Sequence, residues 1–140
     1  DWTLPRFALG AHPMLVQDGE PDAQVQEGER VYSATDWNSN PRTALAHTSD
    51  GDVLLITVDG RTSAGAGMST PALADWLDET FDVRSAINLD GGGSTTFVVN
   101  GCWVGSSFDE AGVRVFNAPS DNGLPNADGA RGVSNGIYLQ

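Results

Sequence analysis

Residues 87–96 read Ile-Asn-Leu-Asp-Gly-Gly-Gly-Ser-Thr-Thr, a short apolar run followed by an acid, three glycines and three hydroxyl residues. The apolar run at 86–89 predicts a buried strand that ends at Asp90. Three consecutive glycines cost backbone entropy, so they indicate positive φ angles or a ligand close to the bare backbone. Successive N–H groups in such a turn can form an anion-binding nest. A carboxylate beside a nest indicates chemistry on an anionic substrate; the alternative is a glycine-rich hairpin turn.

A helix is predicted before this strand, over about residues 71–81. Ser69 or Thr70 caps its N-terminus, and Pro71 suits the first helical position, where its missing N–H costs nothing. The expected apolar face consists of side chains at helical spacing, namely Leu73, Trp76, Leu77 and Phe81. The expected solvated face is acidic and consists of Asp75, Asp78 and Glu79. This helix is therefore expected to be part of the scaffold and not of the site.

Short strands account for most of the remaining pattern. The expected strands are residues 14–16, 31–33, 42–47, 53–58, 83–89, 95–99, 102–105, 113–116 and 137–139. The Asp50-Gly51 and Asn100-Gly101 steps are hairpin signals. Residues 53–58 form a nearly continuous apolar run, which favours a buried central position in the sheet. Strands, one helix and more strands predict an α+β fold with a mixed, mostly antiparallel sheet and one main helix.

Polar residues follow two of these strands directly. Asp59 comes immediately after the strand at 53–58, and Asp90 comes immediately after the strand at 83–89. If the two strands are parallel neighbours joined through the helix, a right-handed crossover places both aspartates at the same edge of the sheet. Ligands bind outside the carboxyl ends of strands in sheets of this kind. This edge is therefore the expected site.

The composition restricts the classes of partner. The 140 residues suit one domain with a sizeable core, and no apolar run approaches the ~18 residues of a membrane span. The net charge is −12, and all seven basic residues are arginines. Nucleic-acid binding is not expected, because it rests on neutralising phosphates. An anionic substrate needs a local arginine cluster that works against the overall field. The single cysteine, Cys102, is expected to be a buried structural thiol.

Four ordered blocks, spread from about residue 12 to residue 137, resemble the phosphodiester glycosidase family. They are Pro41-Arg42-Thr43-Ala44; Val58-Asp59-Gly60-Arg61 with the later Gly67-Met68-Ser69; Asn88-Leu89-Asp90-Gly91-Gly92-Gly93-Ser94-Thr95; and Asn117-Ala118-Pro119-Ser120-Asp121 with Arg131-Gly132-Val133-Ser134-Asn135. Two features depart from the family pattern. Ala130 stands where family members usually carry an acidic residue, and the family domain normally begins with further strands upstream. Residues 1–140 are therefore expected to form a single domain that lacks, or is separated from, an N-terminal part, with a companion chain or segment as a partner.

The resemblance implies hydrolysis of a sugar-1-phosphodiester, of the α-N-acetylglucosamine-1-phosphodiester type, by a secreted or cell-envelope protein. Cleaving the sugar C1–O bond requires a carboxylate as nucleophile or as base for water. Asp59 and Asp90 are the candidate carboxylates. A phosphodiester leaving group is a weak base, so arginines and N–H groups can stabilise most of its charge. The candidate substrate-binding residues are Arg42, Thr43, Arg61, Asn88, Gly91, Gly92, Gly93, Ser94, Thr95, Asn117, Arg131 and Asn135.

Other readings of the same residues stay open. The acidic composition permits a divalent cation, calcium or magnesium, at Asp90, although no His or Asp cluster has ligand spacing. Ser94 has no accompanying histidine in its motif, so it is not expected to be a covalent nucleophile. The alternative functions are a glycoside hydrolase of the same fold acting on a non-phosphorylated polysaccharide, a non-catalytic carbohydrate- or phosphoglycan-binding module, and one chain of a cleaved precursor that is inactive until paired.

Overall fold

The computed structural model describes residues 8–22, 38–100, 113–121, 130–133 and 136–138 of the chain. The elements in chain order are β1 (Met14–Gln17), β2 (Glu20–Pro21), β3 (Arg42–Thr48), β4 (Val53–Val58), α3 (Thr70–Thr80), β5 (Val83–Asn88), the 3-10 helix η1 (Gly92–Ser94), β6 (Val98–Asn100) and β7 (Val113–Val115). The expected strands at 31–33 and 102–105 lie outside the described residues.

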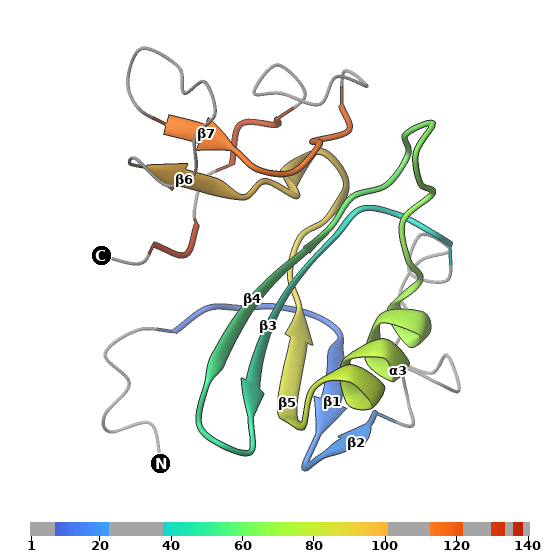
Figure 1. Ribbon diagram of the computed structural model, residues 1–140, viewed down its shortest axis with the longest axis vertical. Helices are drawn as coiled ribbons and strands as arrows, with labels where there is room; N and C mark the ends of the chain where they lie inside the picture. The colour runs from blue at the N-terminus through green and yellow to red at the C-terminus, as the bar shows by residue number, and fades with distance from the viewer. Residues whose placement is uncertain (1–7, 23–37, 101–112, 122–129, 134–135, 139–140) are drawn as a thin grey trace.

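Five strands form the main sheet in the order β2-β1-β5-β3-β4, and β6 and β7 form a separate two-stranded ribbon (Figure 1). Every neighbouring pair is antiparallel. In the middle of the sheet Leu45 of β3 lies opposite Leu55 of β4 on one side and Ile87 of β5 on the other. The α+β fold with a mostly antiparallel sheet and one main helix is confirmed.

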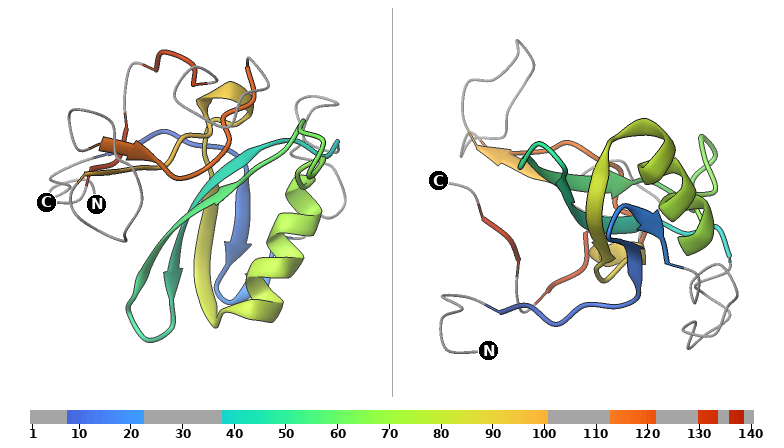
Figure 2. Two further views of the ribbon diagram at one scale, coloured as in Figure 1. Left: turned by 45° about the horizontal axis from the view of Figure 1, so that its top comes forward. Right: turned by 90° about the horizontal axis from the view of Figure 1, so that it is seen from below.

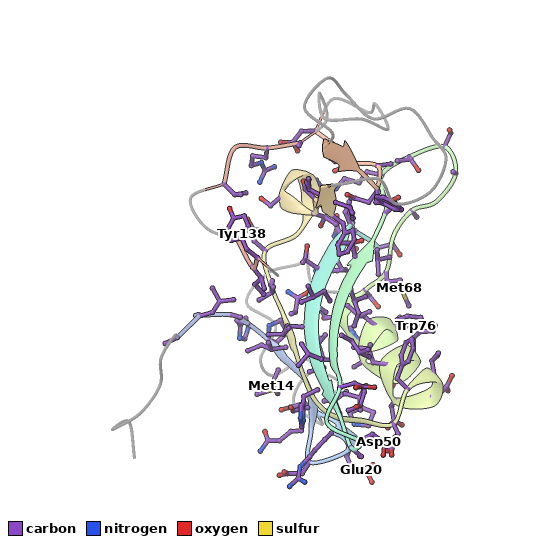
Figure 3. All side chains as sticks on the ribbon, turned by 60° about the vertical axis from the view of Figure 1, so that its left-hand side comes forward. Met14, Glu20, Asp50, Met68, Trp76 and Tyr138 are labelled. Atoms are coloured by element: carbon purple, nitrogen blue, oxygen red, sulfur yellow. The ribbon has the colours of Figure 1, made fainter. Side chains whose placement is uncertain are left out.

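Helix α3 forms where its local signals place it. Ser69 is the N-cap, and its side chain accepts a hydrogen bond from the Ala72 N–H at 3.2 Å. The buried face comprises Thr70, Leu73, Ala74 and Leu77, and the acidic residues face solvent. Trp76 departs from the prediction: it is 37% exposed, because it sits at the margin of the apolar face and packs edge-on against Phe81. Figure 3 shows Trp76 on the outer side of the helix.

The core lies between α3 and one face of the sheet. The helix packs over β1, β2 and β5 (Figure 2). The fully buried core consists of Leu15, Val16, Ala44, Ala46, Leu73, Ala74, Leu77, Val83 and Ala86. On the opposite face Met14, Leu45 and Ile87 border a shallow apolar hollow of about 210 Å³, and Figure 3 shows Met14 on this side. The sheet therefore has two apolar faces in its middle, and the helix covers one of them.

Among the described strands, β4 is at the end of the sheet's strand order, which contradicts its predicted central position. Its apolar run has another cause. Leu54, Ile56 and Val58 pack against the core, whereas Leu55 lies opposite Leu45 on the other face. Because successive side chains of a strand point to opposite faces, a continuous apolar run records two apolar faces and not two neighbouring strands.

Strands β4 and β5 are not neighbours, because β3 lies between them. Since β3 is antiparallel to both, β4 and β5 nonetheless run parallel to each other. Asp59 and Asp90 thus follow the carboxyl ends of two parallel strands at the same end of the sheet. The expectation that the two strands are neighbours is therefore wrong, but the two aspartates do follow strand ends at the same end of the sheet.

The C-terminal part of the chain adds the ribbon beyond this end of the sheet (Figure 1). β6 pairs with β7, and Phe97 packs edge-on against Phe116. The expected strand at 137–139 is not formed at its two described residues. Ile137 and Tyr138 are 40% and 83% exposed, so this short apolar run has no cover that would favour strand pairing in the described part of the chain.

Candidate functional site

A polar cleft of about 320 Å³ lies at the carboxyl end of β5, where the glycine turn meets the start of β3. Its lining comes from five segments: His12; Asn40, Pro41 and Arg42; Arg61; Asn88, Leu89, Asp90, Gly91 and Gly92; and Arg131. Three of the seven arginines of this acidic chain therefore gather at one place. The local arginine cluster that an anionic substrate requires is present.

Three of the four N–H groups of the predicted anion nest, those of Gly92, Ser94 and Thr95, form hydrogen bonds within the chain. The N–H of Gly92 donates to the Pro41 carbonyl, and the N–H groups of Ser94 and Thr95 donate to carbonyls within the 3-10 turn. The N–H of Gly91 donates to Oδ1 of Asp90 at 2.9 Å. These four donors have partners within the chain, so the arginine side chains are the main candidates for binding an anion in the cleft.

An acidic side chain packs against the third glycine, in the space that a Cβ would fill. A Cβ on Gly93 would lie 2.0 Å from Cγ and Oδ1 of Asp121. Asp121 in turn holds Arg131: Nε and Nη2 of the guanidinium donate to the two carboxylate oxygens at 2.9 and 3.0 Å. The N–H of Arg131 also donates to the Gly93 carbonyl at 2.9 Å. Both residues of this ion pair therefore contact the glycine turn at Gly93, Asp121 through its carboxylate and Arg131 through its backbone N–H.

The charges around the turn influence one another. The hydrogen bond from Arg131 is the main cause that lowers the pKa of Asp121, and the charges of Arg131 and Arg61 lower it further. The pKa of Arg131 is raised, first by its hydrogen bond to Asp121 and least by the charge of Asp90. Asp121 is therefore ionised at neutral pH. Although 32% of its side chain is exposed, it acts as the fixed partner of Arg131.

Arg61 is positioned by an amide and not by a carboxylate. Its Nε and Nη2 both donate to Oδ1 of Asn40, at 3.0 and 2.8 Å. Asn40 is 9% exposed, and its backbone forms two hydrogen bonds with Met68 across a β-bridge. Gly67 makes this bridge feasible, because its φ is +98° and a Cβ there would lie 2.2 Å from the Asn40 carbonyl oxygen. The loop at 60–68 thereby sets the position of Arg61 on the cleft wall.

Three predicted binding residues have structural contacts instead of open surfaces. Arg42 is 5% exposed and donates to the Met68 carbonyl at 2.8 Å and the Asn38 carbonyl at 2.9 Å. The hydroxyls of Thr43 and Thr95 share a hydrogen bond of 3.2 Å, and Thr95 is fully buried. Arg42 still lines the cleft, whereas Thr43 and Thr95 do not.

Asp59 and Asn117 meet each other outside the cleft lining. Oδ1 of Asp59 accepts hydrogen bonds from Asn117 Nδ2 at 3.1 Å and from the Ala118 N–H at 2.9 Å. The Asn117 side chain also donates to the Thr95 carbonyl and accepts from the Phe97 N–H, each at 2.7 Å. This network ties the end of β4 to the segment that leads to Asp121. The catalytic role of Asp59 stays a prediction that this contact does not favour.

Asp90 and Asn88 lie in the cleft itself. Asp90 is exposed, and its Oδ1 accepts a hydrogen bond from the N–H of the next residue, Gly91. Asn88 is 6% exposed, and its Nδ2 donates to the His12 carbonyl at 2.9 Å. That bond orients the amide, and the buried Oδ1 has no hydrogen-bond partner among the described residues. The hydroxyl of Ser94 is likewise buried without a partner.

Of the predicted site residues, the structure brings Arg42, Arg61, Asn88, Asp90, Gly91, Gly92 and Arg131 into the cleft, with Gly93 beside it. Asn135 lies outside the described residues. Sequence reasoning missed the roles of Asn40, Asp121 and His12. Asp121 had a signal, because it closes the Asn-Ala-Pro-Ser-Asp block and Ala130 leaves the position before Arg131 without an acid. Asn40 and His12 carried no comparable signal.

Two general findings apply to the described part of the chain. No three His, Cys, Asp or Glu side chains there gather into a group that could hold a metal ion. The proposed calcium or magnesium ion therefore stays a prediction. No helix in the same residues has the length and apolar character needed to cross a membrane.

Known proteins resemble the chain in sequence and structure. The bovine N-acetylglucosamine-1-phosphodiester alpha-N-acetylglucosaminidase is 34% identical over 103 residues, which cover 70% of this chain and 19% of that protein. The SPbeta prophage-derived uncharacterized protein YomE of Bacillus subtilis is 34% identical over 110 residues, covering 74% of this chain and 15% of that protein. The crystal structure of a hypothetical protein from Synechocystis matches 63% of this chain and 16% of its own, with 29% identity and a TM-score of 0.53.

The chain thus spans less than a fifth of the length of each of these proteins. Its own whole length is nevertheless covered by one family model, which matches residues 1–140 and describes a phosphodiester glycosidase. The blocks that carry the resemblance are those that build the cleft. The chain belongs to the phosphodiester glycosidase family.

Proposed function

We propose that the cleft hydrolyses the bond between a sugar C1 and a phosphodiester, with an α-linked N-acetylglucosamine-type sugar as the donor. The single observation that carries this proposal is the gathering of Arg61, Arg131 and Asp90 around the glycine turn. Family membership and the names of the relatives support the same reaction class. The proposal concerns the cleft itself, so it holds equally if the cleft is part of a longer chain.

Arg61 and Arg131 form the phosphate-binding half of the cleft. Nε and Nη2 of Arg131 are held by the carboxylate of Asp121, and Nε and Nη2 of Arg61 are held by the amide oxygen of Asn40. Both guanidinium groups are therefore positioned by the protein. Preorganised guanidinium groups stabilise the charge that develops on a departing phosphate without reorganising during the reaction. Arginine suits this task because its planar donors match phosphate oxygens.

Asp90 forms the other half, next to the sugar carbon. Its carboxylate is anchored through one oxygen and is the carboxylate that lines the cleft among the described residues. Glycoside cleavage passes through an oxocarbenium-like centre, which a carboxylate stabilises as nucleophile or as base for water. We assign this role to Asp90 and leave the stereochemical outcome to experiment.

The proposed substrate is consistent with the one carboxylate, that of Asp90, in the described lining of the cleft. A sugar alcohol leaving group normally requires a second carboxyl group as acid. A phosphodiester leaves as a weak base and needs little protonation, so the arginines suffice. This difference favours a phosphodiester over the alternative of a non-phosphorylated polysaccharide.

The test is hydrolysis of UDP-N-acetylglucosamine by the wild type, Asp90→Asn and Asp78→Asn. Asp78 is exposed on α3, so its variant makes the same chemical change away from the cleft. We expect free sugar from the wild type and Asp78→Asn, and a loss of about 10³-fold or more in kcat for Asp90→Asn. Turnover that survives Asp90→Asn would overturn the assignment. Binding without turnover in the wild type would favour the non-catalytic module.

A further inference from the structure

Asn88 carries a side-chain acceptor that the described part of the chain leaves without a hydrogen bond. Its backbone N–H donates to the Pro13 carbonyl at 2.9 Å, and its carbonyl accepts from the His12 N–H at 3.0 Å. Its Nδ2 donates to the His12 carbonyl at 2.9 Å. Because a carbonyl oxygen only accepts, this bond identifies the nitrogen of the amide and turns Oδ1 away from His12. Three hydrogen bonds thus fix Asn88, and Oδ1 is the polar atom that they leave over.

This oxygen is buried next to the cleft. Asn88 is 6% exposed, and it belongs to the lining of the cleft. A buried acceptor without a partner costs free energy, since it has lost its water and gained no bond in exchange. Native proteins keep few such atoms, so each one calls for an explanation. A ligand in the cleft that brings a donor to Oδ1 recovers this cost, and the oxygen is already held in place to receive it.

The order of groups around the glycine turn puts Asn88 at the sugar end of the cleft. At the other end, a Cβ on Gly92 would lie 3.1 Å from Nη1 of Arg61. Asp90 lies between Gly92 and Asn88, which is the last residue of β5. A sugar-1-phosphodiester has its parts in the same order, namely phosphate, C1 and the rest of the ring. With the phosphate at the arginines and C1 beside Asp90, the ring extends toward Asn88.

Resting on the proposed function, we propose that Asn88 binds the C2 substituent of the sugar: Oδ1 accepts a hydrogen bond from the donor on C2, an acetamido N–H or a hydroxyl. C2 is bonded to C1, so its substituent is the donor nearest to the reacting carbon, whereas the ring oxygen on the other side of C1 only accepts. Asn88 lies two residues before Asp90, and both line the cleft. Hydrogen bonds to the C2 position strengthen in the transition state of glycoside cleavage.

The test compares the dissociation constants of UDP-N-acetylglucosamine and UDP-2-deoxyglucose, which has no donor on C2. Titration calorimetry in an Asp90→Asn background prevents loss of the sugar by turnover. Asn88→Leu removes the acceptor at similar side-chain volume, and we expect the ratio of the two constants to shift by about tenfold in favour of the deoxy sugar. Structural damage common to both probes, and the contribution of the acetyl group, cancel in this double comparison.

Asn40→Leu is the matched control. It makes the same change at another nearly buried asparagine of the lining, the one that holds Arg61 at the phosphate end. Both probes should bind more weakly, and their ratio should stay within about twofold. Asn88→Ala, which adds no bulk, replaces Asn88→Leu if the leucine prevents folding. If neither variant folds, UDP-glucose should bind about tenfold more tightly than UDP-2-deoxyglucose to protein that keeps Asn88, since the two differ by the C2 hydroxyl.

Two results would overturn the inference. They are a ratio that stays within about twofold when Asn88 is replaced, and the absence of measurable binding of either probe while Asn88 is present. Either would leave Oδ1 with a bound water or a purely structural role. Release of free sugar by protein that keeps Asp90 tests the proposed hydrolysis separately. Turnover with an unchanged ratio would refute the role of Asn88 alone, and a shifted ratio without turnover would refute the hydrolysis and not this inference.

Discussion

The Gly67→Ala substitution tests how the loop at 60–68 supports the cleft. Gly67 has a φ of +98°, and a Cβ there would lie 2.2 Å from the Asn40 carbonyl oxygen. The obstructing atom belongs to backbone, so it cannot rotate away as a flexible side chain would. The contact is relieved only by separating the bridge between Asn40 and Met68, whose two hydrogen bonds measure 3.2 and 3.0 Å.

The expected cost has two parts. An alanine in the left-handed region costs about 1–2 kcal/mol. Losing the two backbone hydrogen bonds of the bridge costs about 0.5–1.5 kcal/mol each, which brings the total to about 2–5 kcal/mol. Because Asn40 moves with its backbone, the acceptor of Arg61 moves too, so affinity for dimethyl phosphate should fall in the same variant.

Gly51→Ala is a closely matched control. Gly51 has a φ of +97° but no heavy atom within 4 Å of its would-be Cβ, so only the conformational cost of about 1–2 kcal/mol applies. Urea denaturation should therefore show Gly67→Ala to be less stable than Gly51→Ala by about 1–3 kcal/mol, or roughly 4–12 °C in Tm. If the two variants lose equal stability, the close approach between Gly67 and Asn40 does not exist and the reasoning fails.

Two further predictions concern the acids at the end of the sheet. Asp59→Asn should reduce kcat/KM less than about tenfold, against about 10³-fold for Asp90→Asn, because Asp59 holds Asn117 and Ala118 and does not line the cleft; equal losses in steady-state kinetics would restore Asp59 as a catalytic residue. The hydrogen bond from Arg131 lowers the pKa of Asp121 below 3.8, so its contribution to stability is complete above that value and is lost as pH falls through the lowered pKa. The unfolding free energy measured by urea between pH 5 and pH 2.5 should accordingly fall more steeply for the wild type than for Asp121→Asn, and parallel curves would contradict this.

Local signals predicted the elements that depend on local interactions. The Ser69-Thr70-Pro71 sequence fixes the start of α3 because a cap and a proline act within one turn. The order of the strands could not be predicted from the sequence. The apolar run of β4 shows that both faces of the strand are apolar, but it does not show whether other strands pair with one or both of its edges. The edge position of β4 is a property of the whole sheet.

The glycine turn illustrates the same limit at the site. Its location beside Asp90 followed from the sequence, but the reason for Gly93 did not. The sequence suggests an open nest, whereas the N–H groups of Gly92, Ser94 and Thr95 form hydrogen bonds within the chain and Gly93 packs against the carboxylate of Asp121. That contact joins segments far apart in the fold, and no periodicity or spacing encodes it.

The position of β3 bears on how the reaction can proceed. Two strands that flank a third are separated by about 9–10 Å, because neighbouring strands lie about 4.8 Å apart. Carboxylate pairs in glycosidases are about 5–5.5 Å apart when retaining and about 6.5–9.5 Å when inverting. The ends of β4 and β5 therefore start Asp59 and Asp90 near the upper end of the inverting range, and the side chain of Asp59 binds Asn117 and Ala118.

A cleft built in this way suits a leaving group that needs no strong acid. Apart from Asp90 and the arginines, His12 is the group in the described lining that can transfer a proton. An alkoxide leaving group would depend on such an acid, whereas a phosphodiester depends on the cations that already face it. The spacing of the sheet and the one carboxylate in the described lining thus both favour the proposed phosphodiester substrate.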